Sequence, residues 1–575
     1  MRHGAYFTPH LHLFCIYRLR NRVIWSIALS IDDLLPADVI LHMGNDEPCP
    51  NRSGDRDDTD APDPSGRGSA DNDPQRMTSR AQSDIATRIA AGTAWLVAAR
   101  LAARAIDFLG LLILANLLLP ADFGLVAVAL TVVQIAEAVF ELPVGQVLVR
   151  SEMITRDLLD TAFTVGLLRG ALLAALMIAA AEPFAILYRD PRLAALLCLL
   201  VIAPASRAVV SPAMTHFAKA IDFRRDLLIE LVGKGMALGC SIWLALVSRS
   251  YWAIAIGTIV NPVAMAAASY AVAPYRPRLS LTRWGEFAHF VGWSTASQLI
   301  SAINWQIDRL LLGRLVPSAA LGAYVLAGDI AAVPEQAFVK PIGRPLIAAF
   351  TQLRQDPPRL MAAYLRTVTS VLTVGLPVML GLSILAQPAV HLALGPKWQS
   401  SWPILQWLAV SLIPPLLTAP LGALAVTLGR TDIFLRRNLI ELAVTVPSII
   451  AGAYVYGIAG VIATRLGLSL LMALVAAIFV RQLLGASIPR QCAGLWRPLV
   501  AAAGLALALF LLRGRLHGLD DLPLALGIIA CAAVGLAVYG TILLLSWEWS
   551  GRPKGIETLL AGWVTSSWAR FRPRV

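Results

Sequence analysis

The sequence predicts an all-α polytopic membrane protein with about fourteen transmembrane helices, arranged as two six-helix lobes plus two extra helices. Of its 575 residues, 57% are hydrophobic and only 15% are charged, and the mean hydropathy of +0.67 exceeds what a soluble core can bury. Apolar stretches of about 20 residues, the length that a helix needs to cross roughly 30 Å of hydrocarbon, recur from residue 92 onward. Polar breaks separate these stretches, and breaks that are rich in Lys and Arg alternate with breaks that are poor in them.

Residues 1–76 differ in composition from the rest of the chain. Residues 44–76 are rich in Asp, Pro, Gly and Ser and almost lack aliphatic side chains, which is typical of disordered segments. The apolar stretch at residues 23–31 is too short to cross a bilayer, although its length would suit the core of a signal peptide. We interpret residues 1–76 as a disordered extension or a misassigned start, so that Met77 begins the functional chain.

The candidate spans share their length and their low content of charge. Their approximate limits are 92–119, 124–149, 158–181, 193–215, 227–248, 251–272, 286–312, 321–345, 366–390, 402–428, 436–457, 459–482, 497–513 and 523–547. From these limits we expect an N-lobe of spans 1–6, a C-lobe of spans 7–12, a pair formed by spans 13 and 14, and a cytoplasmic tail. The corresponding boundaries are 77–275, 276–490, 491–547 and 548–575.

The distribution of positive charge predicts the orientation. Seventeen Lys and Arg residues occupy the six breaks after even-numbered spans, whereas seven occupy the seven breaks after odd-numbered spans. By the positive-inside rule, the even breaks and both termini are cytoplasmic. The net charge of +12 does not indicate a nucleic-acid partner, because the arginines are scattered singly between apolar segments and form no basic face.

Two segments that lie six spans apart resemble each other. Residues 114–128 read LANLLLPADFGLVAV, and residues 312–326 read LGRLVPSAALGAYVL. Each has two leucines three residues apart, then a proline, then a glycine four or five residues later at the start of the next helix. An even offset preserves orientation across the membrane, so this repeat predicts two six-helix lobes with the same topology.

Several motifs carry a resemblance to a known family. The stretch that begins MTSRAQSDIATRIAAGTAWL at Met77 resembles the opening helices of bacterial polysaccharide transporters of the Wzx-like type. Further matching motifs are AIDFRR at 220–225, YRPRLSL at 275–281, IDRLLLGRLVPSAALGAYVLA at 307–327, LGPKW at 394–398 and LGRTD at 428–432. The similarity covers roughly residues 80–490, and the wider superfamily also contains multidrug (MATE) exporters and lipid II flippases.

The resemblance implies both an architecture and a function. It implies a V-shaped bundle of two six-helix lobes around a central cavity, with spans 13 and 14 as an appendage. It also implies a flippase of the bacterial inner membrane that moves undecaprenyl-pyrophosphate-type lipid-linked oligosaccharides between leaflets by alternating access, with membrane lipid, a polysaccharide polymerase and export proteins as partners. A MATE-like multidrug exporter and a polytopic polysaccharide polymerase remain alternatives.

The sequence offers no motif for catalysis or metal binding. It contains no Walker loop, no Ser-His-Asp set and no metal-ligand cluster, and its six cysteines lack metal-ligand spacing. We therefore predict no cofactor, no metal, no catalytic residue and no enzyme activity. Transport would then draw on an ion gradient, the membrane potential or the supply of substrate.

Ionisable residues inside spans are costly and by default mark a cavity or a pathway. Arg100, Arg104 and Asp107 of span 1 are spaced to lie on one helical face, where they either line a substrate cavity or form an internally neutralised stripe against another helix. Arg169 in span 3 and Arg207 in span 4 either line the same cavity or pair locally.

Span 7 carries a polar stripe on one helical face. Its members recur at three- and four-residue intervals and are Ser294, Ser297, Ser301, Asn304 and Asp308. We interpret Asn304 and Asp308 as residues of the substrate cavity. Near the periplasmic mouth, Asp308 could form a gate with a basic residue of the opposite lobe, such as Arg100 or Arg104. Arg309 lies on another face and is expected to reach for the membrane interface.

Five further residues are candidates for ion coupling or gating. Glu137 and Glu141 lie one turn apart in span 2, where two close carboxylates could share a proton or pair with the arginines of span 1. Asp329, Glu335 and Lys340 lie in span 8, which is unusually rich in proline and charge. Such broken helices often border transport sites, although span 8 could also end early and leave Lys340 in the cytoplasm.

Overall fold

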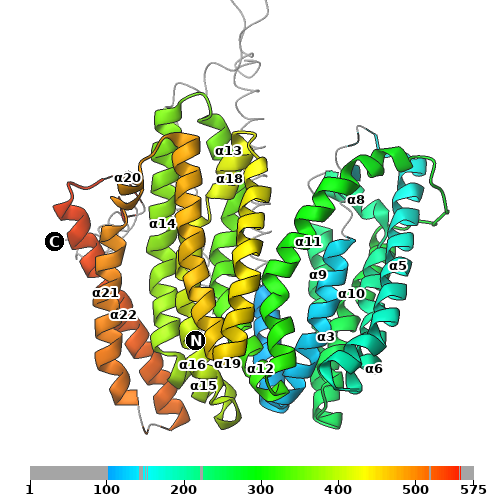
Figure 1. The fold of residues 1–575 in the computed structure, drawn as a ribbon, viewed down its shortest axis with the longest axis horizontal. Coiled ribbons are helices and arrows are strands. Elements are labelled where there is room, and N and C mark those ends of the chain that lie inside the picture. Colours follow the sequence, from blue (N-terminus) through cyan, green and yellow to red (C-terminus); the bar gives the residue numbers. More distant parts are fainter. Residues whose placement is uncertain are drawn as a thin grey trace, which may run out of the picture. The chain divides into compact units, whose positions relative to one another are not determined.

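The structure, a computed structural model, describes residues 102–140, 153–219, 224–516 and 520–553 together with a few single residues between and after these segments. These residues form helices joined by short turns, and no strand occurs among them (Figure 1). The predicted all-α fold is thereby confirmed.

The first helix group comprises residues 102–117 and the helices up to residue 272. Its labelled members are α3 (Pro120–Val139), α5 (Arg156–Tyr188), α6 (Arg192–Leu200), α7 (Ile202–Ala208), η2 (Pro212–Met214), α8 (Thr215–Lys219), α9 (Arg224–Ser248) and α10 (Trp252–Val272). α9 packs along α10, and α7 packs against both α5 and α10. The local sequence sets the helix starts: Pro120 occupies the first turn of α3, where a missing N–H costs nothing, and Thr155 caps α5 through the Leu158 N–H.

The second helix group follows a linker at residues 273–283. Its members are α11 (Trp284–Leu315), α12 (Ser318–Pro334), η3 (Glu335–Val339), η4 (Lys340–Ile342), α13 (Gly343–Gln352), α14 (Pro357–Ile384), α15 (Ala386–Leu394), η5 (Pro396–Trp398), α16 (Ser401–Ser411), α17 (Ile413–Thr418), α18 (Leu421–Thr427) and α19 (Asp432–Leu484). α19 packs on α11 and α16, and α14 packs on α16 and α17. The chain then continues through α20 (Ile488–Cys492), α21 (Trp496–Arg513), η6 (Gly514–Leu516) and α22 (Asp521–Trp549). α21 and α22 pack on each other and on α14.

Span 8 does not stop at its prolines. α12 ends at Pro334, a π-helical turn and a 3₁₀ turn follow, and α13 resumes at Gly343. Because proline lacks an N–H and clashes with the preceding turn, Pro334 and Pro341 account for the irregular backbone that carries Glu335 and Lys340. The interpretation of span 8 as a broken helix agrees with this geometry.

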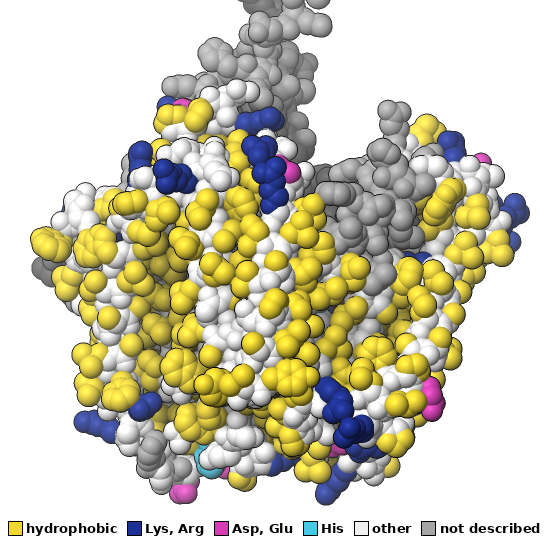
Figure 2. All heavy atoms as spheres, viewed as in Figure 1, with side chains coloured by type: hydrophobic (Ala, Val, Ile, Leu, Met, Phe, Trp, Pro, Cys, Tyr) yellow, Lys and Arg dark blue, Asp and Glu magenta, His cyan; other side chains and the backbone are white. Residues whose placement is uncertain are grey.

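The described helices suit a membrane. Nine of them are long and apolar enough to span one, counting only the described residues. On the face that Figure 2 shows, hydrophobic side chains cover the middle, and Lys and Arg gather toward the two ends. α19 counts as one of the nine although Gly457, with a φ of 58°, interrupts its 53 residues. The figure of fourteen spans stays a prediction.

The repeated motif forms the crossing between the two helix groups. A Cβ atom on Gly124 of α3 would lie 1.9 Å from the Ser318 carbonyl oxygen, and one on Gly322 of α12 would lie 1.8 Å from the Pro120 carbonyl oxygen. The two glycines therefore play the same part in a nearly symmetric contact, each facing the start of the other helix. This agrees with the duplication inferred from the sequence.

A second contact between the groups involves the LGPKW motif. Trp398 is fully buried and donates from Nε1 to the Ala115 carbonyl oxygen at 2.8 Å, while the Lys397 ammonium donates to the carbonyl oxygens of Asn116 and Leu118. Asn116 returns a bond from Nδ2 to the Ala393 carbonyl oxygen at 2.7 Å. The carbonyls at a helix C-terminus lack partners within the helix, so this motif completes the end of helix 102–117. Burial lowers the pKa of Lys397.

α11 belongs to both groups along its length. Phe287, in its first turn, is buried among Leu158, Leu159 and Ala162 of α5, whereas its later turns pack on α19 and α3. The boundary of the lobes at residue 275 stays a prediction, as does the assignment of residues 1–76, which lie outside the described residues.

Candidate functional site

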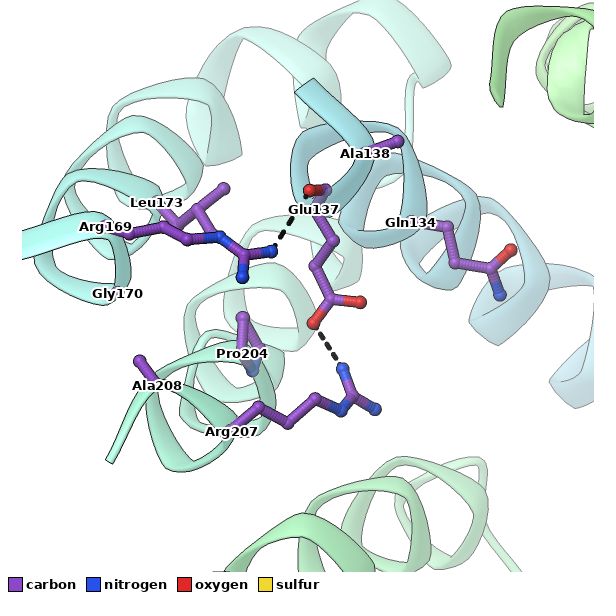
Figure 3. A pocket seen from close by; sticks show the side chains of 9 residues that line it. All are labelled: Gln134, Glu137, Ala138, Arg169, Gly170, Leu173, Pro204, Arg207 and Ala208. Atoms are coloured by element: carbon purple, nitrogen blue, oxygen red, sulfur yellow. Dashed lines mark hydrogen bonds and ion pairs between the residues drawn. The ribbon is translucent and has the colours of Figure 1, made fainter. Parts of the chain in front are cut away.

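A cavity of about 370 Å³ opens within the first helix group (Figure 3). Its lining comes from three helices and comprises Gln134, Glu137, Ala138, Arg169, Gly170, Leu173, Pro204, Arg207 and Ala208. Glu137 points between the two arginines: its carboxylate pairs with Arg207 Nη1, and its backbone carbonyl accepts from Arg169 Nη2 at 3.3 Å. Two predicted cavity residues and one predicted coupling residue thus meet at a single site.

Glycines of α5 bring the helices of this site close together. A Cβ atom on Gly170 would lie 2.5 Å from Ala208 Cβ, and one on Gly166 would lie 2.8 Å from the Ala208 carbonyl oxygen. Because these positions have no side chain, α7 can approach α5 closely enough for Arg169 and Arg207 to flank Glu137. A charged group in such a location is expensive unless it is paired, which explains why Arg207 pairs with the Glu137 carboxylate while Arg169 donates to the Glu137 backbone carbonyl.

A second polar cluster lies in the other helix group. Asp308 of α11 is buried and accepts a hydrogen bond from Tyr324 Oη of α12. Arg465 of α19 lies 2.7 Å from the same carboxylate. The expected gate partner in the opposite lobe is therefore wrong: α19 packs against this face of α11 and supplies the arginine from the same group.

The neighbours of Asp308 also differ from expectation in part. Arg309 pairs with Asp329 of α12 at 2.8 Å, so the interpretation that Arg309 reaches for the interface is wrong, because a carboxylate lies within its reach. Asn304 is buried and donates from Nδ2 to the Asn438 carbonyl oxygen at 3.2 Å. The side chains of Ser294 and Ser297 lie outside the described residues.

The charged face of span 1 pairs with α9. Arg104 lies 3.7 Å from Asp107, and its side chain is 52% exposed. Asp107 also pairs with Lys234, which lies 3.6 Å from Glu230 one turn away on α9. Basic and acidic side chains thus alternate in the order Arg104, Asp107, Lys234 and Glu230. Arg100 lies outside the described residues.

Glu335 and Lys340 do not line the Glu137 site. Glu141 lies outside the described residues. The Lys340 ammonium lies 5.9 Å from the ring centroid of Trp305, within the range of a cation–π contact, and Glu335 sits in the π-helical turn.

Sequence reasoning missed Arg465, Tyr324 and Gln134. A signal for Arg465 exists, because it is the single charged residue between positions 442 and 480, and an isolated arginine in a span demands a counter-charge. Tyr324 and Gln134 carry no such signal. Gln134 bonds to Gln306 of α11 across the two groups.

Comparison with known proteins identifies the family. A family model described as "Polysaccharide biosynthesis protein" matches residues 113–403, which is just over half of the chain. The chain belongs to this family. Curated relatives of this polysaccharide biosynthesis family member include the lipopolysaccharide biosynthesis protein WzxC of Escherichia coli (strain K12), 24% identical over 420 residues that cover 71% of this chain and 84% of WzxC. The succinoglycan biosynthesis transport protein ExoT of Rhizobium meliloti (strain 1021) is 28% identical over 320 residues, which cover 55% of this chain and 65% of ExoT.

Solved structures agree on the fold. The lipid II flippase MurJ in an inward closed conformation matches with a TM-score of 0.64 at 13% identity, over 79% of this chain and 99% of MurJ. An inward-facing MATE family multidrug transporter matches with a TM-score of 0.54 at 14% identity, over 67% of this chain and 95% of that chain. The predicted family and helical membrane fold are confirmed, and this family member is a multi-pass membrane protein.

Proposed function

We propose that the protein moves polyprenyl-pyrophosphate-linked oligosaccharide repeat units of the undecaprenyl type from the cytoplasmic to the periplasmic leaflet of a bacterial inner membrane, for lipopolysaccharide or exopolysaccharide assembly. The observation that supports this most is the cavity in which Arg169 and Arg207 converge on Glu137. Both termini would be cytoplasmic, as the positive-inside rule predicts. A polysaccharide polymerase and export proteins would then receive the product.

The chemistry of the cavity suits a diphosphate. Arginine offers a planar fork of donors that matches phosphate oxygens. Glu137 balances the charge of Arg207 in the structure. An arriving diphosphate would take the place of that carboxylate and keep the arginines neutralised. At about 370 Å³, near the lower end of small-molecule pockets, the cavity suits the diphosphate and its neighbouring sugar better than a whole repeat unit.

The other predicted residues would act around this site. Arg104 and Asp107 on helix 102–117, and Arg100 in the same predicted span, would extend the polar surface that the oligosaccharide passes. Asn304 and Asp308 on α11, which are buried in this structure, would join that surface in a conformation that opens their site. Asp329, Glu335, Lys340 and Glu141 stay candidates for coupling or gating. The two helix groups would rock about the α3–α12 crossing to alternate access.

A multidrug exporter of the same fold is the competing function. Cationic drugs would favour a cavity dominated by carboxylates, whereas two arginines and one glutamate line this one. The lining therefore favours an anionic passenger.

Transport in proteoliposomes tests the proposal. Vesicles would contain the protein and a polyprenyl-pyrophosphate-linked oligosaccharide, and a membrane-impermeant glycosidase would report the fraction of oligosaccharide in the outer leaflet over time. We expect wild-type protein to exchange the passenger between leaflets and the Arg207→Gln variant to slow exchange at least tenfold. Efflux of a cationic dye without movement of the oligosaccharide would contradict the proposal.

A charge exchange separates binding from structure. The Glu137→Arg/Arg207→Glu variant keeps the ion pair and inverts its direction. If Arg207 serves only to hold α3 against α7, the exchanged pair restores both folding and transport. If it binds phosphate, the exchanged protein folds and transport stays slow, which is the outcome we expect.

A further inference from the structure

The linker between the two helix groups is fastened to α5. Tyr275 donates from its hydroxyl to Asp160, the Ser280 N–H donates to Thr164 Oγ1 at 2.9 Å, and the Arg283 N–H donates to Thr161 Oγ1 at 3.3 Å. Asp160, Thr161 and Thr164 are all buried. The polar side chains of one helical face thus hold residues 275–283 along the first three turns of α5.

A cavity of about 530 Å³ lies where this linker begins. It is lined by Arg156, Leu159, Tyr270, Pro274, Tyr275 and Arg276. Leu159, Pro274 and the two tyrosine rings make one part of its wall apolar, and the arginines supply positive charge from α5 and from the linker. The cavity is separate from the Glu137 site, since the two share no lining residue.

Among the residues that the structure describes, no carboxylate pairs with the arginines of this cavity. Within the described part of the chain, neither Arg156 nor Arg276 has an ion pair. Asp160 is occupied by the Tyr275 hydroxyl, and Asp157, the next residue after Arg156, projects from a different side of the helix. Burial, together with the hydrogen bond to Asp160, raises the pKa of Tyr275, so this hydroxyl stays neutral and does not offset the arginines.

The length of α5 places the cavity at the level of lipid headgroups. α5 has 33 residues and is about 50 Å long at 1.5 Å per residue, which exceeds the roughly 30 Å of hydrocarbon. With the helix centred in the bilayer, Arg156 lies about 24 Å from the midplane and about 9 Å beyond the hydrocarbon edge. Tyr270, near the end of α10, lies closer to that edge.

We propose that this cavity binds the phosphodiester headgroup of an anionic phospholipid, in the leaflet that the arginine distribution predicts to be cytoplasmic. Arg156 and Arg276 hold the phosphate between them through charge-assisted hydrogen bonds. Arg156 is the first residue of α5, so the positive end of the helix dipole adds to the attraction. The tyrosine rings, Leu159 and Pro274 pack against the glycerol and the first methylenes, which a free phosphate ion does not have.

Bound lipid joins α5 to the linker, and this gives the proposal a direct readout. A ligand that binds the folded state alone raises its stability. We expect phosphatidylglycerol, added to the full chain in detergent, to raise the midpoint of thermal unfolding more than phosphatidylcholine with the same acyl chains. Mass spectrometry of the intact protein would show that it retains one phosphatidylglycerol molecule in preference to phosphatidylcholine.

Variants with matched charge changes test the location of the site. Arg156→Gln with Arg276→Gln should weaken phosphatidylglycerol binding at least tenfold. Arg354→Gln with Arg490→Gln removes two exposed arginines that are also predicted to lie on the cytoplasmic side of the membrane. This variant should bind phosphatidylglycerol as the wild type does. Arg156→Lys with Arg276→Lys keeps the charge and should retain most of the preference, which also shows whether loss in the glutamine variant reflects loss of folding.

Three results would overturn the proposal. The first is equal retention of phosphatidylglycerol by the Arg156→Gln/Arg276→Gln variant and the wild type. The second is equal loss in the Arg354→Gln/Arg490→Gln control, which would indicate nonspecific attraction. The third is equal stabilisation by inorganic phosphate at the same concentration and ionic strength, which would indicate a site for the free anion.

Discussion

Asp308 is a buried carboxylate whose charge is balanced from two other helices. Tyr324 of α12 and Arg465 of α19 both reach it, and the Arg309 N–H donates to its Oδ1 at 2.9 Å. An ion this deep persists only where partners replace its hydration. The cluster therefore ties α11, α12 and α19 together at one point.

Removing one member of this cluster should destabilise the protein strongly. Asp308→Asn leaves Arg465 without its carboxylate, and breaking a buried pair from one side costs about 3–5 kcal/mol in the free energy of unfolding. Adding Arg465→Met removes the stranded charge and should recover most of that loss. Thermal unfolding of the single and double variants measures both effects.

A surface pair provides the control for this prediction. Glu548 and Arg552 lie 3.2 Å apart with both side chains more than half exposed, and pairs of this kind contribute about 0.5 kcal/mol or less. Glu548→Gln should therefore leave the unfolding midpoint nearly unchanged. A similar unfolding midpoint for Asp308→Asn and Glu548→Gln would show that Asp308 does not stabilise the packing of these helices.

For single residues, sequence patterns predict which helical face is polar but do not predict which residue of another helix pairs with it. The three- and four-residue spacing that ends at Asn304 and Asp308 indicates a polar helical face, and the structure buries both of these side chains. It cannot say that Arg465 lies opposite, because that depends on how α19 packs after its interruption at Gly457. For the same reason Glu137 meets Arg207 of α7, since the glycines of α5 set that approach, while Arg104 of span 1 lies beside Asp107.

At the scale of helices, the repeated motif explains why α3 and α12 touch at glycine. Each glycine faces the first turn of the other helix, so any side chain there meets a backbone carbonyl. Backbone atoms in a helix cannot move aside as a flexible side chain can. The proline that precedes each glycine fixes the start of its helix, and the pair of motifs thereby sets the crossing.

Gly124→Ala and Gly322→Ala should each separate these helices. The added Cβ would lie within 2 Å of a carbonyl oxygen, and overpacking of this kind typically costs about 1–3 kcal/mol in stability. Gly235→Ala in α9, where nothing lies within 4 Å of the new Cβ, is the matched control and should stabilise by up to about 1 kcal/mol through helix propensity. Thermal unfolding compares the three variants, and equal midpoints for Gly235→Ala and Gly124→Ala would count against a close crossing.

The helices themselves follow from the sequence more completely than their interruptions do. Apolar length and charge breaks locate α9, α10, α21 and α22 to within three residues, whereas α5 ends seven residues later and α14 begins nine residues earlier than predicted. The division of span 4 into α6 and α7, and of span 10 into α16, α17 and α18, depends on local turns at positions that hydropathy treats alike. Span 8 is the exception, because its prolines predict the irregular turns between α12 and α13.

For the whole molecule, the contact made by the LGPKW motif opposes separation of the two helix groups. Trp398 and Lys397 of one group satisfy carbonyl oxygens at the end of helix 102–117 in the other, and Phe123 packs edge-on against Trp398 with ring centroids 5.2 Å apart. By the predicted topology this end faces the periplasm. A transporter that releases its passenger there must break these bonds in each cycle and form them again.

Holding this contact closed should therefore stop transport while leaving the fold intact. In a background without native cysteines, Asn116→Cys and Ala393→Cys place thiols on two residues in direct contact, since Asn116 Nδ2 lies 2.7 Å from the Ala393 backbone carbonyl oxygen, and a short reducible cross-linker can join them. We expect the cross-linked protein to lose oligosaccharide exchange in proteoliposomes and to regain it on reduction, because the α3–α12 crossing can then rock again. Ser211→Cys with Ala273→Cys, whose parent residues bond within one group, should tolerate the same reagent. Undiminished exchange through a fully cross-linked Asn116–Ala393 pair would mean that the passenger crosses without any opening at this end, and alternation between two closed ends could not be how this protein works.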